Sequence, residues 1–453
     1  MSRTSPHPRA VRGFRIADGV LHRSAFRSRA PPGGRQSKPQ ENDVALIRPF
    51  RALRYTEAAG PLRELVAPPY DVIDARERER LAEQSPANAV HLILPKGDEP
   101  YRVAASLLAD FQKKGWLATD GEPAFFVYAQ RFDVQGRSNE RWGLLSALEL
   151  QPFSANVVLP HERTLAGPKA DRLNLIRACR TNLSPIFGLV DVALELASLV
   201  AGKQPFAEFT DKAGVTHRLW RITDAASVAQ LVGRVAEQQV FIADGHHRYE
   251  ISLAYRDERR AVETDKGKPH AYDFVLCYLC STRDPGLVVL PTHRLLKDAP
   301  EHDALLARLQ ATCRVTELPD GAALLAKLEQ PSANGELRLG LVRRGHAQGW
   351  LVEATEKTPL EGLAAELRAL EVSFLHEAVL PGIPADRFTY THDDREALDA
   401  VEAGDADLAI LLPPPRVSDV LSISRAALTM PQKSTYFHPK VLTGLAFHGL
   451  DTD

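Results

Sequence analysis

Cysteine is scarce in this sequence of 453 residues, which contains only Cys179, Cys277, Cys280 and Cys313. So few cysteines in so long a chain exclude a disulfide framework. Cys277 and Cys280 form a C-x-x-C pair, but they fall in an apolar, strand-like segment, and positions three apart in a strand face opposite sides of its sheet. Because the sequence has no second C-x-x-C pair, we expect buried, apolar cysteines rather than a zinc site.

The sequence also lacks an excess of one charge and a long apolar run. Its 56 Lys and Arg residues nearly balance 58 Asp and Glu residues, which gives a formal net charge of −2. This balance provides no reason to expect nucleic acid or an anionic membrane as a partner. No run of about 18 apolar residues occurs, and no secretory signal follows the N-terminus. We therefore expect a cytoplasmic protein that does not span a membrane.

Four common motifs are absent: G-x-x-x-x-G-K-[ST], G-x-G-x-x-G, H-E-x-x-H and G-x-S-x-G. Their absence excludes a Walker-type phosphate loop, a Rossmann fingerprint, a common zinc-peptidase helix and the usual hydrolase elbow. A phosphate group would therefore have to bind at helix N-termini and arginine side chains.

Composition and periodicity divide the chain into three expected parts. Residues 1–44 hold nine Arg and Lys against three Asp and Glu, without sustained periodicity. We interpret them as a disordered basic tail, or as an extension upstream of the natural start. Strand-like and helical segments alternate from residue 45 to about 300, and a second alternation follows. We predict an α/β or mixed α+β fold, with a core domain over 45–300 and a C-terminal α/β lobe over 301–453.

The elements themselves are expected from apolar runs and helical periodicity. Strands are expected at 91–95, 124–132, 141–150, 184–192, 216–222, 240–243, 272–279, 286–291, 337–344, 349–354 and 407–412. Helices are expected at 103–115, 248–260, 302–314, 320–329, 360–371, 394–403 and 416–428.

The stretch VFIADGHHRYEISLAY, residues 240–255, places a polar cluster between an apolar strand and an amphipathic helix. Free backbone N–H groups and the positive end of the dipole make such a helix N-terminus favourable for an anion. The cluster consists of Asp244, Gly245, His246, His247 and Arg248. The alternative interpretation is an N-capping Asp244 followed by solvated histidines.

Two further segments carry candidate residues in the first half of the chain. In LVAPPYDVI, residues 65–73, two prolines stiffen the backbone before Tyr70 and Asp71, although a plain proline turn explains the pattern equally well. In the segment 157–190, an apolar strand precedes several polar residues. Glu162 would serve there as a general base, and arginine or lysine side chains would hold phosphate. The polar residues are His161, Glu162, Arg163, Thr164, Lys169, Asp171 and Arg172. A solvated charged helix over 170–180 is the alternative interpretation.

Similar polar clusters follow the apolar strand in GLVVLPTHRLL, residues 286–296, and occur in MPQKSTYFHPK, residues 430–440. The second of these supplies the donors Lys433, Ser434, Thr435 and Lys440. Four strand ends with His, Lys or Arg beside small hydroxyl residues predict one cleft lined with anion-binding groups.

Several of these segments together resemble one bacterial family, domain of unknown function 1015. The similar segments, from about Ile47 to the C-terminus, are IRPFRALRY, APPYDVI, PHERT, FIADGHHRYE, LPTHRLL, ADLAILL and MPQKSTYF. The family name implies no activity. More distantly, D-G-H-H-R after a strand resembles the ParB/sulfiredoxin superfamily and its free-serine kinase branch, which implies a ParB/sulfiredoxin-like core. That superfamily's sulfinic-acid reductases have cysteine in this turn and its partitioning proteins carry a helix-turn-helix, so we expect neither activity here.

The kinase resemblance implies transfer of a phosphoryl group from ATP or ADP, with Mg²⁺, to free L-serine or a similar hydroxyl amino acid. Phosphates would contact Gly245, His246, Arg248, Arg163, Lys433, Ser434 and Thr435. Catalysis would fall to Glu162, Asp244 and His247, and the acceptor would contact Tyr70, Asp71, His161 and Arg172. One alternative is a nucleotide-binding regulatory or hydrolytic protein. Another is a hydrolase whose metal is bound by His161, Asp244, His246 and His247.

Overall fold

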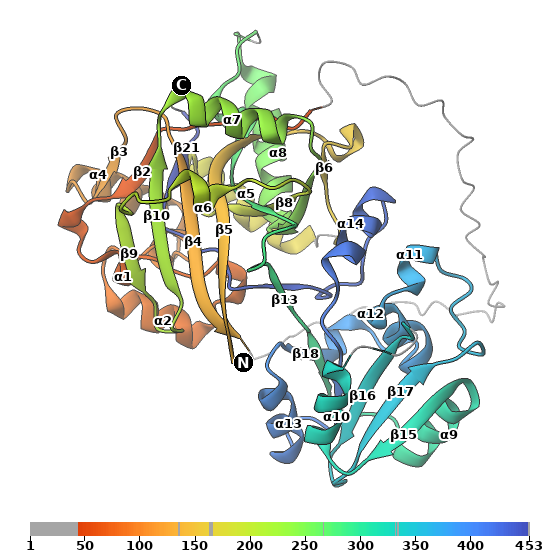
Figure 1. The fold of residues 1–453 in the computed structure, drawn as a ribbon. Helices are drawn as coiled ribbons and strands as arrows, with labels where there is room; N and C mark the ends of the chain where they lie inside the picture. The colour runs from red at the N-terminus through yellow and green to blue at the C-terminus, as the bar shows by residue number, and fades with distance from the viewer. Residues whose placement is uncertain are drawn as a thin grey trace, which may run out of the picture. The chain divides into compact units, whose positions relative to one another are not determined.

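The computed structural model describes residues 44–134, 136–162, 166–265, 267–330, 332 and 335–451, which all belong to one compact unit, Glu41–Asp453. Its elements confirm a mixed α/β fold with a second α/β lobe (Figure 1). The expected tail over 1–44 lies, except for Val44, outside the described residues and stays a prediction. None of the described helices combines the length and apolar character that a membrane crossing needs.

Nine of the described strands form the main sheet, in the order β6-β11-β8-β12-β5-β4-β10-β9, with β1 paired to β5. Their bounds are β1 Ile47–Arg48, β4 Phe125–Val134, β5 Arg137–Glu149, β6 Val158–Leu159, β8 Ile186–Val190, β9 Ala207–Thr210, β10 Thr216–Ile222, β11 Val240–Asp244 and β12 Phe274–Ser281. The ladders β6/β11 and β8/β12 are parallel, and the other ladders of the sheet are antiparallel.

Both faces of this sheet are buried, which explains why its central strands are apolar at nearly every position. Along β4, Phe125 and Val127 face one core cluster, whereas Phe126 and Tyr128 face the other. The first cluster also includes Leu231 of helix α7 (Ala225–Ala236), and Figure 1 shows α7 and α6 (Leu196–Leu199) over one face of the sheet.

The four cysteines are free and buried, as expected. Cys277 and Cys280 on β12 belong to different core clusters and therefore face opposite sides of the sheet. Burial raises the pKa of both thiols. They act as small apolar side chains in the core.

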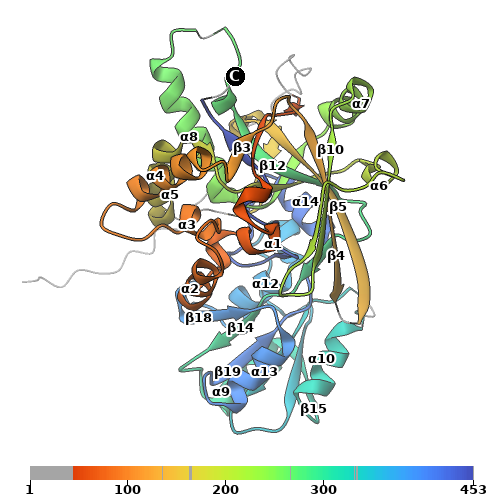
Figure 2. The same ribbon diagram turned by 90° about the vertical axis from the view of Figure 1, so that its left-hand side faces the viewer.

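A smaller sheet has the order β3-β2-β21-β7 and packs against helices formed by the first part of the chain. Its strands are β2 Ala52–Tyr55, β3 Leu117–Thr119, β7 Thr181–Asn182 and β21 Phe447–Gly449. The neighbouring helices are α1 Leu62–Leu65, α2 Ala75–Gln84, α3 Val90–Ile93, α4 Pro100–Lys113 and α5 Ala166–Cys179, some of them seen in the turned view of Figure 2.

The strand expected at 91–95 is wrong, because Val90–Ile93 forms the short helix α3. The Asn88 side chain donates to the Glu64 and Val66 carbonyls and accepts the Val90 N–H at 2.9 Å, which fixes a helical turn. An apolar run of four or five residues does not distinguish a buried strand from a buried helical turn.

The second lobe contains an antiparallel sheet of six described strands, in the order β15-β17-β16-β19-β14-β18. The strands are β14 His293–Leu296, β15 Cys313–Leu318, β16 Arg338–Arg343, β17 Gly349–Ala354, β18 Phe388–Thr391 and β19 Leu408–Leu411. The helices of this lobe are α9 His302–Thr312, α10 Gly321–Glu329 and α13 Asp394–Glu402. Helices α11 Ala365–Arg368, α12 Glu371–Phe374 and α14 Val417–Arg425 contribute residues to a core cluster of the main sheet. The helix expected over 360–371 is thus two short turns rather than one element.

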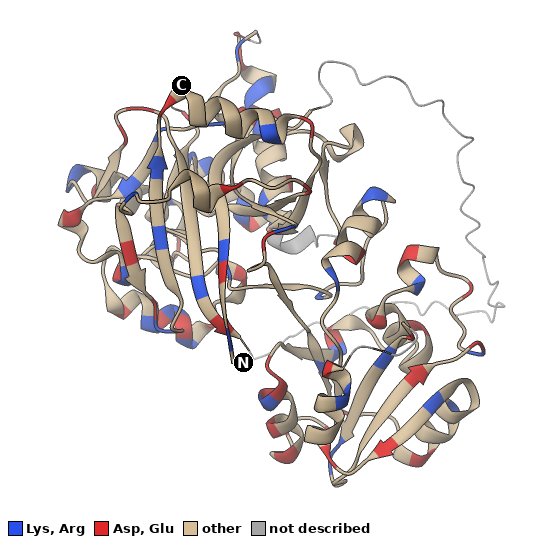
Figure 3. Cartoon of the chain, viewed as in Figure 1, with Lys and Arg blue, Asp and Glu red and all other residues tan. Residues whose placement is uncertain are grey.

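The remaining short elements complete the chain. The 3-10 turns are η1 Glu57–Ala59, η2 Tyr70–Val72, η3 Phe153–Ala155, η4 Ala271–Asp273 and η6 Ala385–Arg387, and η5 Leu375–Val379 is a π-helical turn. Basic and acidic residues are interspersed along the helices and strands (Figure 3), as the near-neutral net charge suggests.

The division of the strands differs from the expected boundary between residues 300 and 301. The apolar run at 287–296 breaks at Pro291, so that β13 (Val288–Leu290) pairs with β20 (Tyr436–His438) and β14 already belongs to the second lobe. β21 returns to the sheet of β2. The second lobe therefore lies within the first part, between β13 and β20, and the chain ends outside it.

Residues 430–440, which we call the return segment, are fixed to both lobes by buried arginines. Arg141 on β5 donates to the carbonyls of His438 at 3.1 Å and Pro439 at 2.5 Å. Arg294 on β14 donates to the Lys433 carbonyl at 3.1 Å. Because both guanidinium groups are buried, these carbonyls supply part of the hydrogen bonding that their charge requires.

Phe447→Ala tests whether the last strand stabilises the first half of the chain. Phe447 is 0% exposed and packs edge-on against Tyr55, with ring centroids 5.9 Å apart. Truncation should lower the free energy of unfolding by about 3–5 kcal/mol, measured by urea denaturation. The control, Val262→Ala at a 77% exposed position, should change it by less than about 0.5 kcal/mol. Equal midpoints for the two variants would contradict the assignment of β21 to this core.

Candidate functional site

A cavity of about 380 Å³ lies where the main sheet, the second lobe and the return segment meet. It brings together the segments that the sequence singled out. From the first part it is lined by Tyr70, Asp71, Val72, Glu162, Ala243, Asp244, Gly245, His246, His247 and Arg248. The second lobe and the return segment add Thr292, Tyr390, Thr391, His392, Gln432, Lys433, Thr435, Tyr436 and Lys440.

The N-terminus of helix α8 (His246–Val262) forms one wall of this cavity. Strand β11 ends at Asp244, and Gly245 turns the chain into the helix with φ of 89°, in the left-handed region that favours glycine. A Cβ at Gly245 would also lie 3.0 Å from Cζ of Arg248. The turn therefore requires glycine both for its backbone conformation and for the close approach of the arginine.

Asp244 is an ion-pair partner rather than a helix cap, which overturns the alternative interpretation of this turn. Gly245 occupies the N-cap position without a side-chain cap. The Asp244 carboxylate accepts hydrogen bonds from Arg248 and, at 2.5 Å, from Nζ of Lys440. Of the two histidines, His246 is only 7% exposed, whereas His247 is partly exposed.

The three charged groups of this cluster carry a net charge of about +1. Burial alone would raise the pKa of Asp244, but Lys440 and Arg248 outweigh it and hold that pKa well below its usual range. Burial likewise opposes the charge of Lys440, and Asp244 more than compensates and raises the lysine pKa. The cluster is therefore ionised at neutral pH, and its own net charge suits an anionic ligand. The Asp71 carboxylate in the same lining also acts on Arg248 and Lys440.

Two buried histidines form a hydrogen-bonded layer behind the helix N-terminus. His161 Nδ1 lies 2.8 Å from the Ile242 carbonyl, and His161 Nε2 lies 3.0 Å from the Thr435 hydroxyl. The backbone N–H of His161 donates to Nε2 of His246 at 3.3 Å. Burial lowers the pKa of His161 to about 4 and that of His246 well below its ordinary value. Both rings are thus neutral near pH 7.

Glu162 presents a partly buried carboxylate to the cavity. Its backbone forms a parallel bridge with Met430, and its Oε1 accepts the backbone N–H of Lys433 at 3.0 Å. Burial raises its pKa, although the Lys433 N–H and ammonium act in the opposite direction. The result is a carboxylate of increased basicity beside the return segment.

The structure brings most of the predicted site residues into the cavity but not all of them. Ser434 is buried, donates to the Pro431 carbonyl at 2.5 Å and lines a separate small cavity. His161 is 1% exposed and supports the site from behind instead of lining it. Arg172 lines a neighbouring cavity. Arg163 lies outside the described residues.

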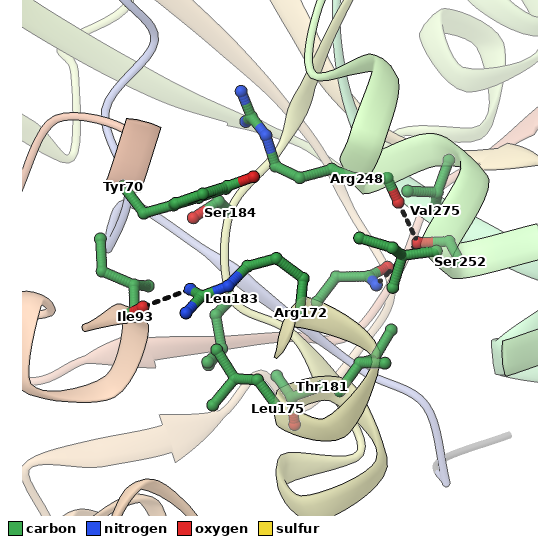
Figure 4. A pocket seen from close by; sticks show the side chains of 13 residues that line it. Tyr70, Ile93, Arg172, Leu175, Thr181, Leu183, Ser184, Arg248, Ser252 and Val275 are labelled. Carbon is green, nitrogen blue, oxygen red and sulfur yellow. Dashed lines mark hydrogen bonds between the residues drawn. The ribbon is translucent and has the colours of Figure 1, made fainter. Parts of the chain in front are cut away.

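That neighbouring cavity, of about 60 Å³, shares Tyr70 and Arg248 with the larger one. Figure 4 shows Tyr70 between the side chains of Arg248 and Arg172. The Arg172 guanidinium lies 4.6 Å from the Tyr70 ring centroid and donates to the Ile93 carbonyl. The other side chains that line this smaller cavity are both apolar and polar: Leu175, Ile176, Leu183, Ile251 and Val275 are apolar, and Thr181, Asn182, Ser184 and Ser252 are polar.

Sequence reasoning missed the aromatic wall of the larger cavity. His392, just after β18, stacks on Tyr436 with ring centroids 4.0 Å apart, and Tyr390 lies beside them in the lining. Lys440 Nζ lies 4.5 Å from the centroid of Tyr436. Lys440 was among the donors noted in the return segment, but the short strand β18 gives no sequence signal for a site.

The arrangement does not favour a site for a transition metal. Among the described residues, no three His, Cys, Asp or Glu side chains are grouped so as to hold a metal ion. His161 uses both ring nitrogens in hydrogen bonds, and Asp244 is paired with two cations. The expected ligand set of a metal-dependent hydrolase is therefore not assembled. Mg²⁺ requires fewer protein ligands, because it is usually bound by one or two carboxylates and the phosphates of the ligand. Asp71 and Glu162 line the cavity and could supply such carboxylates.

Residues 47–373 match the model of a family described as "Protein of unknown function (DUF1015)". No curated protein matches the chain. Among solved structures, a conserved hypothetical protein from Pyrococcus furiosus is 14% identical, with a TM-score of 0.33, over 66% of this chain and 92% of that protein. A free serine kinase in complex with AMP is 14% identical, with a TM-score of 0.34, over 64% of this chain and 86% of the kinase.

SbnI from Staphylococcus aureus, with a C-terminal truncation, is 10% identical, with a TM-score of 0.30, over 66% of this chain and 85% of that protein. TM-scores of 0.30 to 0.34 do not establish a shared fold. The expected ParB/sulfiredoxin-like core and the kinase activity therefore stay predictions, and we base the function on the residues of the cavity.

The pH dependence of stability tests the neutral state of His161. Its folded-state pKa of about 4 lies below the ordinary value of 6.5. The unfolded chain therefore binds more protons between these values, and the free energy of unfolding falls as the pH drops from 6.5 to 4. His161 should account for on the order of 3 kcal/mol of this loss. His376, His438 and His448, whose pKa values burial also lowers to about 4, should add to it.

Urea denaturation at intervals from pH 4 to 7.5 measures this slope. His161→Gln should reduce it by up to about 1.4 kcal/mol per pH unit, and His448→Gln, at a distant buried histidine, should reduce it similarly. An unchanged slope in His161→Gln beside a reduced one in His448→Gln would show that His161 is not held neutral.

Proposed function

Since the chain belongs to the family of proteins of unknown function DUF1015, whose description assigns no activity, we propose its function from the cavity. We propose a phosphotransferase that moves a phosphoryl group from ATP or ADP to the hydroxyl of a small acceptor, free L-serine or a similar hydroxyl amino acid. One observation carries this proposal: the N-terminus of α8 with its cationic cluster and the Glu162 carboxylate line the same cavity.

The phosphate groups would bind at the N-terminus of α8. The first backbone N–H groups of a helix have no partner within it, and the helix dipole adds positive potential there. Lys440 and Lys433 line the same cavity, and the ionised Asp244 cluster carries a net positive charge. Phosphoryl transfer depends mainly on positioning the reactants and neutralising the equatorial oxygens of the transferred group. Fixed donors and cations in a half-enclosed cavity meet both demands.

Glu162 would act as the general base. The acceptor oxygen forms a bond to the terminal phosphorus while the bond from that phosphorus to the bridging oxygen breaks, and the hydroxyl proton passes to the Glu162 carboxylate. The nucleotide then leaves one phosphate shorter. A raised pKa makes Glu162 a better proton acceptor than an ordinary carboxylate. When bound, Mg²⁺ would neutralise phosphate charge, and Asp71 is the residue that would help to hold it.

The small cavity beside Tyr70 would hold the acceptor. It has room for only a few heavy atoms, and it adjoins the larger cavity through Tyr70 and Arg248. Arg172, whose guanidinium lies over Tyr70 and pairs with Asp171, would contribute a cation for a carboxylate. A small hydroxyl amino acid fits this combination of a small volume, walls of mixed polarity and an arginine in the lining. A substrate role for His161, which is buried behind α8, is not part of the proposal.

A second candidate, a nucleotide-binding switch without transfer, is favoured by the position of Glu162 itself. Its Oε1 accepts the Lys433 N–H, so one carboxylate oxygen ties the return segment to the end of β6. In that case the contact between Glu162 and Lys433 would transmit the effect of nucleotide binding to the second lobe, and no acceptor would be phosphorylated.

Acceptor-dependent turnover distinguishes these candidates. With Mg²⁺ and ATP or ADP, a phosphorylated amino acid should appear, detected by mass, only when a suitable hydroxyl amino acid such as L-serine is present. Glu162→Gln should lower kcat by about 10²–10⁴-fold and leave nucleotide affinity nearly unchanged. If nucleotide binds but none of the natural hydroxyl amino acids is phosphorylated, the result would support the nucleotide-binding switch. If nucleotide does not bind and no product forms, both candidate functions would be rejected.

Arg172→Ala tests the acceptor subsite. Loss of the guanidinium should raise the KM for the amino acid about tenfold or more, because a hydrogen bond to a charged group contributes about 1.5–3 kcal/mol, while the KM for nucleotide should stay within twofold. Arg177→Ala is the matched control on the same helix, since Arg177 forms an exposed ion pair with Glu258. A rise in both KM values would instead place Arg172 in the support of the whole site.

A further inference from the structure

We propose that His246 binds an anionic oxygen of the ligand through Nδ1–H of a neutral imidazole, and that the main chain of His161 fixes this tautomer. The proposed function supplies only the identity of the ligand, a nucleotide phosphate. The inference itself rests on which atoms near His246 are able to donate and which are able to accept.

The contact with His161 determines where the proton of His246 resides. A backbone N–H is a donor only, and that of His161 points at Nε2 of His246 at 3.3 Å. Nε2 must therefore be the unprotonated, accepting nitrogen. A neutral ring then carries its hydrogen on Nδ1. A ring protonated at Nε2 would place two N–H groups against each other.

The Nδ1–H group is a donor on a side chain that lines the cavity. Among the described residues, none accepts a hydrogen bond from Nδ1 of His246. The side chain is more than nine-tenths buried and lines the cavity at the first turn of α8. A ligand oxygen at this wall would accept a hydrogen bond from Nδ1–H and would also meet the free N–H groups of the helix.

The hydrogen bonds of His161 also fix its own tautomer and orientation. The Ile242 carbonyl accepts only, so His161 Nδ1 must donate to it, and Nε2 must accept from the Thr435 hydroxyl. The His161 and His246 rings lie edge to face, with centroids 4.7 Å apart. The return segment, through Thr435, thus holds His161, and His161 holds the tautomer of His246. His161 is accordingly a positioning residue rather than a ligand of the substrate.

A neutral donor gives a contact that does not change across physiological pH. The charged and titratable groups around His246 are His161 after β6, Asp244 on β11, His247 and Arg248 on α8, and Lys440 on the return segment. The attraction of Asp244 to an imidazolium is already balanced by Arg248 and Lys440. The negative charge of the ligand would therefore be matched by these cations and by the helix, and His246 would contribute direction without charge.

Nitrogen-15 NMR of the full chain labelled at histidine tests the tautomer directly. Two-bond ¹H–¹⁵N correlations, assigned to His246 by their loss in His246→Asn, should show the Nδ1–H form and no titration from pH 5 to 7.5. Addition of ADP should shift the Nδ1–H resonance downfield. An Nε2–H form, or an imidazolium in this pH range, would overturn the proposal.

Binding measurements on two variants test the contact. Asparagine places an amide N–H near the position of Nδ1, whereas leucine has no donor. The Kd for ADP should rise about 10-fold or more in His246→Leu and less than about threefold in His246→Asn. Equal losses in both variants, with an unmoved Nδ1–H resonance, would contradict a ligand contact. The tautomer is measured without ligand. If ADP does not bind, the proposed function fails, and pyrophosphate is the probe that still decides whether Nδ1–H meets an anionic oxygen.

Discussion

A single buried carboxylate, Asp244, connects the parts of this molecule that form its cavity. Arg248 reaches it from the first turn of α8, and Lys440 reaches it from the return segment. Each of the three groups would be costly to bury alone, and removing one partner from such a buried cluster usually costs about 3–5 kcal/mol. The cluster therefore constrains the direction of α8 and the path of the return segment together. The two cations and one carboxylate of the cluster carry a net charge of about +1, and the ion pairs hold these side chains in place at the cavity.

The histidine layer adds direction to this charge. His161 and His246 are neutral, and the Ile242 carbonyl and the backbone N–H of His161 fix which ring nitrogen of each carries the proton. The cations would supply attraction for an anion, and the helix N–H groups and imidazole would supply geometry. Glu162, in the lining of the same cavity, has the opposite role, because its carboxylate has a raised pKa and can accept a proton. A cavity with separate regions for attracting an anion and for accepting a proton is well suited to group transfer.

The sequence predicted the class of fold and the components of the site better than its connections. Strands such as β12 are buried on both faces, so their apolar runs are unambiguous, and D-G-H-H-R marks a strand-to-helix turn that the structure contains. The helix at 90–93 was missed because Asn88, rather than periodicity, determines it. The role of Asp244 depended on Lys440, which lies 196 residues away. Likewise, nothing local distinguishes Thr435, which reaches the site, from Ser434, which turns to the Pro431 carbonyl.

The pairing of β13 with β20 has a consequence for the order in which the protein takes shape during its synthesis. Chains fold from the N-terminal end as they leave the ribosome, and β13 emerges well before its partner. Until the second lobe has been made, Asp244 has Arg248 but not Lys440, and the main sheet lacks the segment that Arg141 anchors. A nascent chain that already contains every strand of the main sheet thus has no finished cavity. Ligand binding can assist only the last stage of folding, because the site exists only after the whole second lobe has been translated.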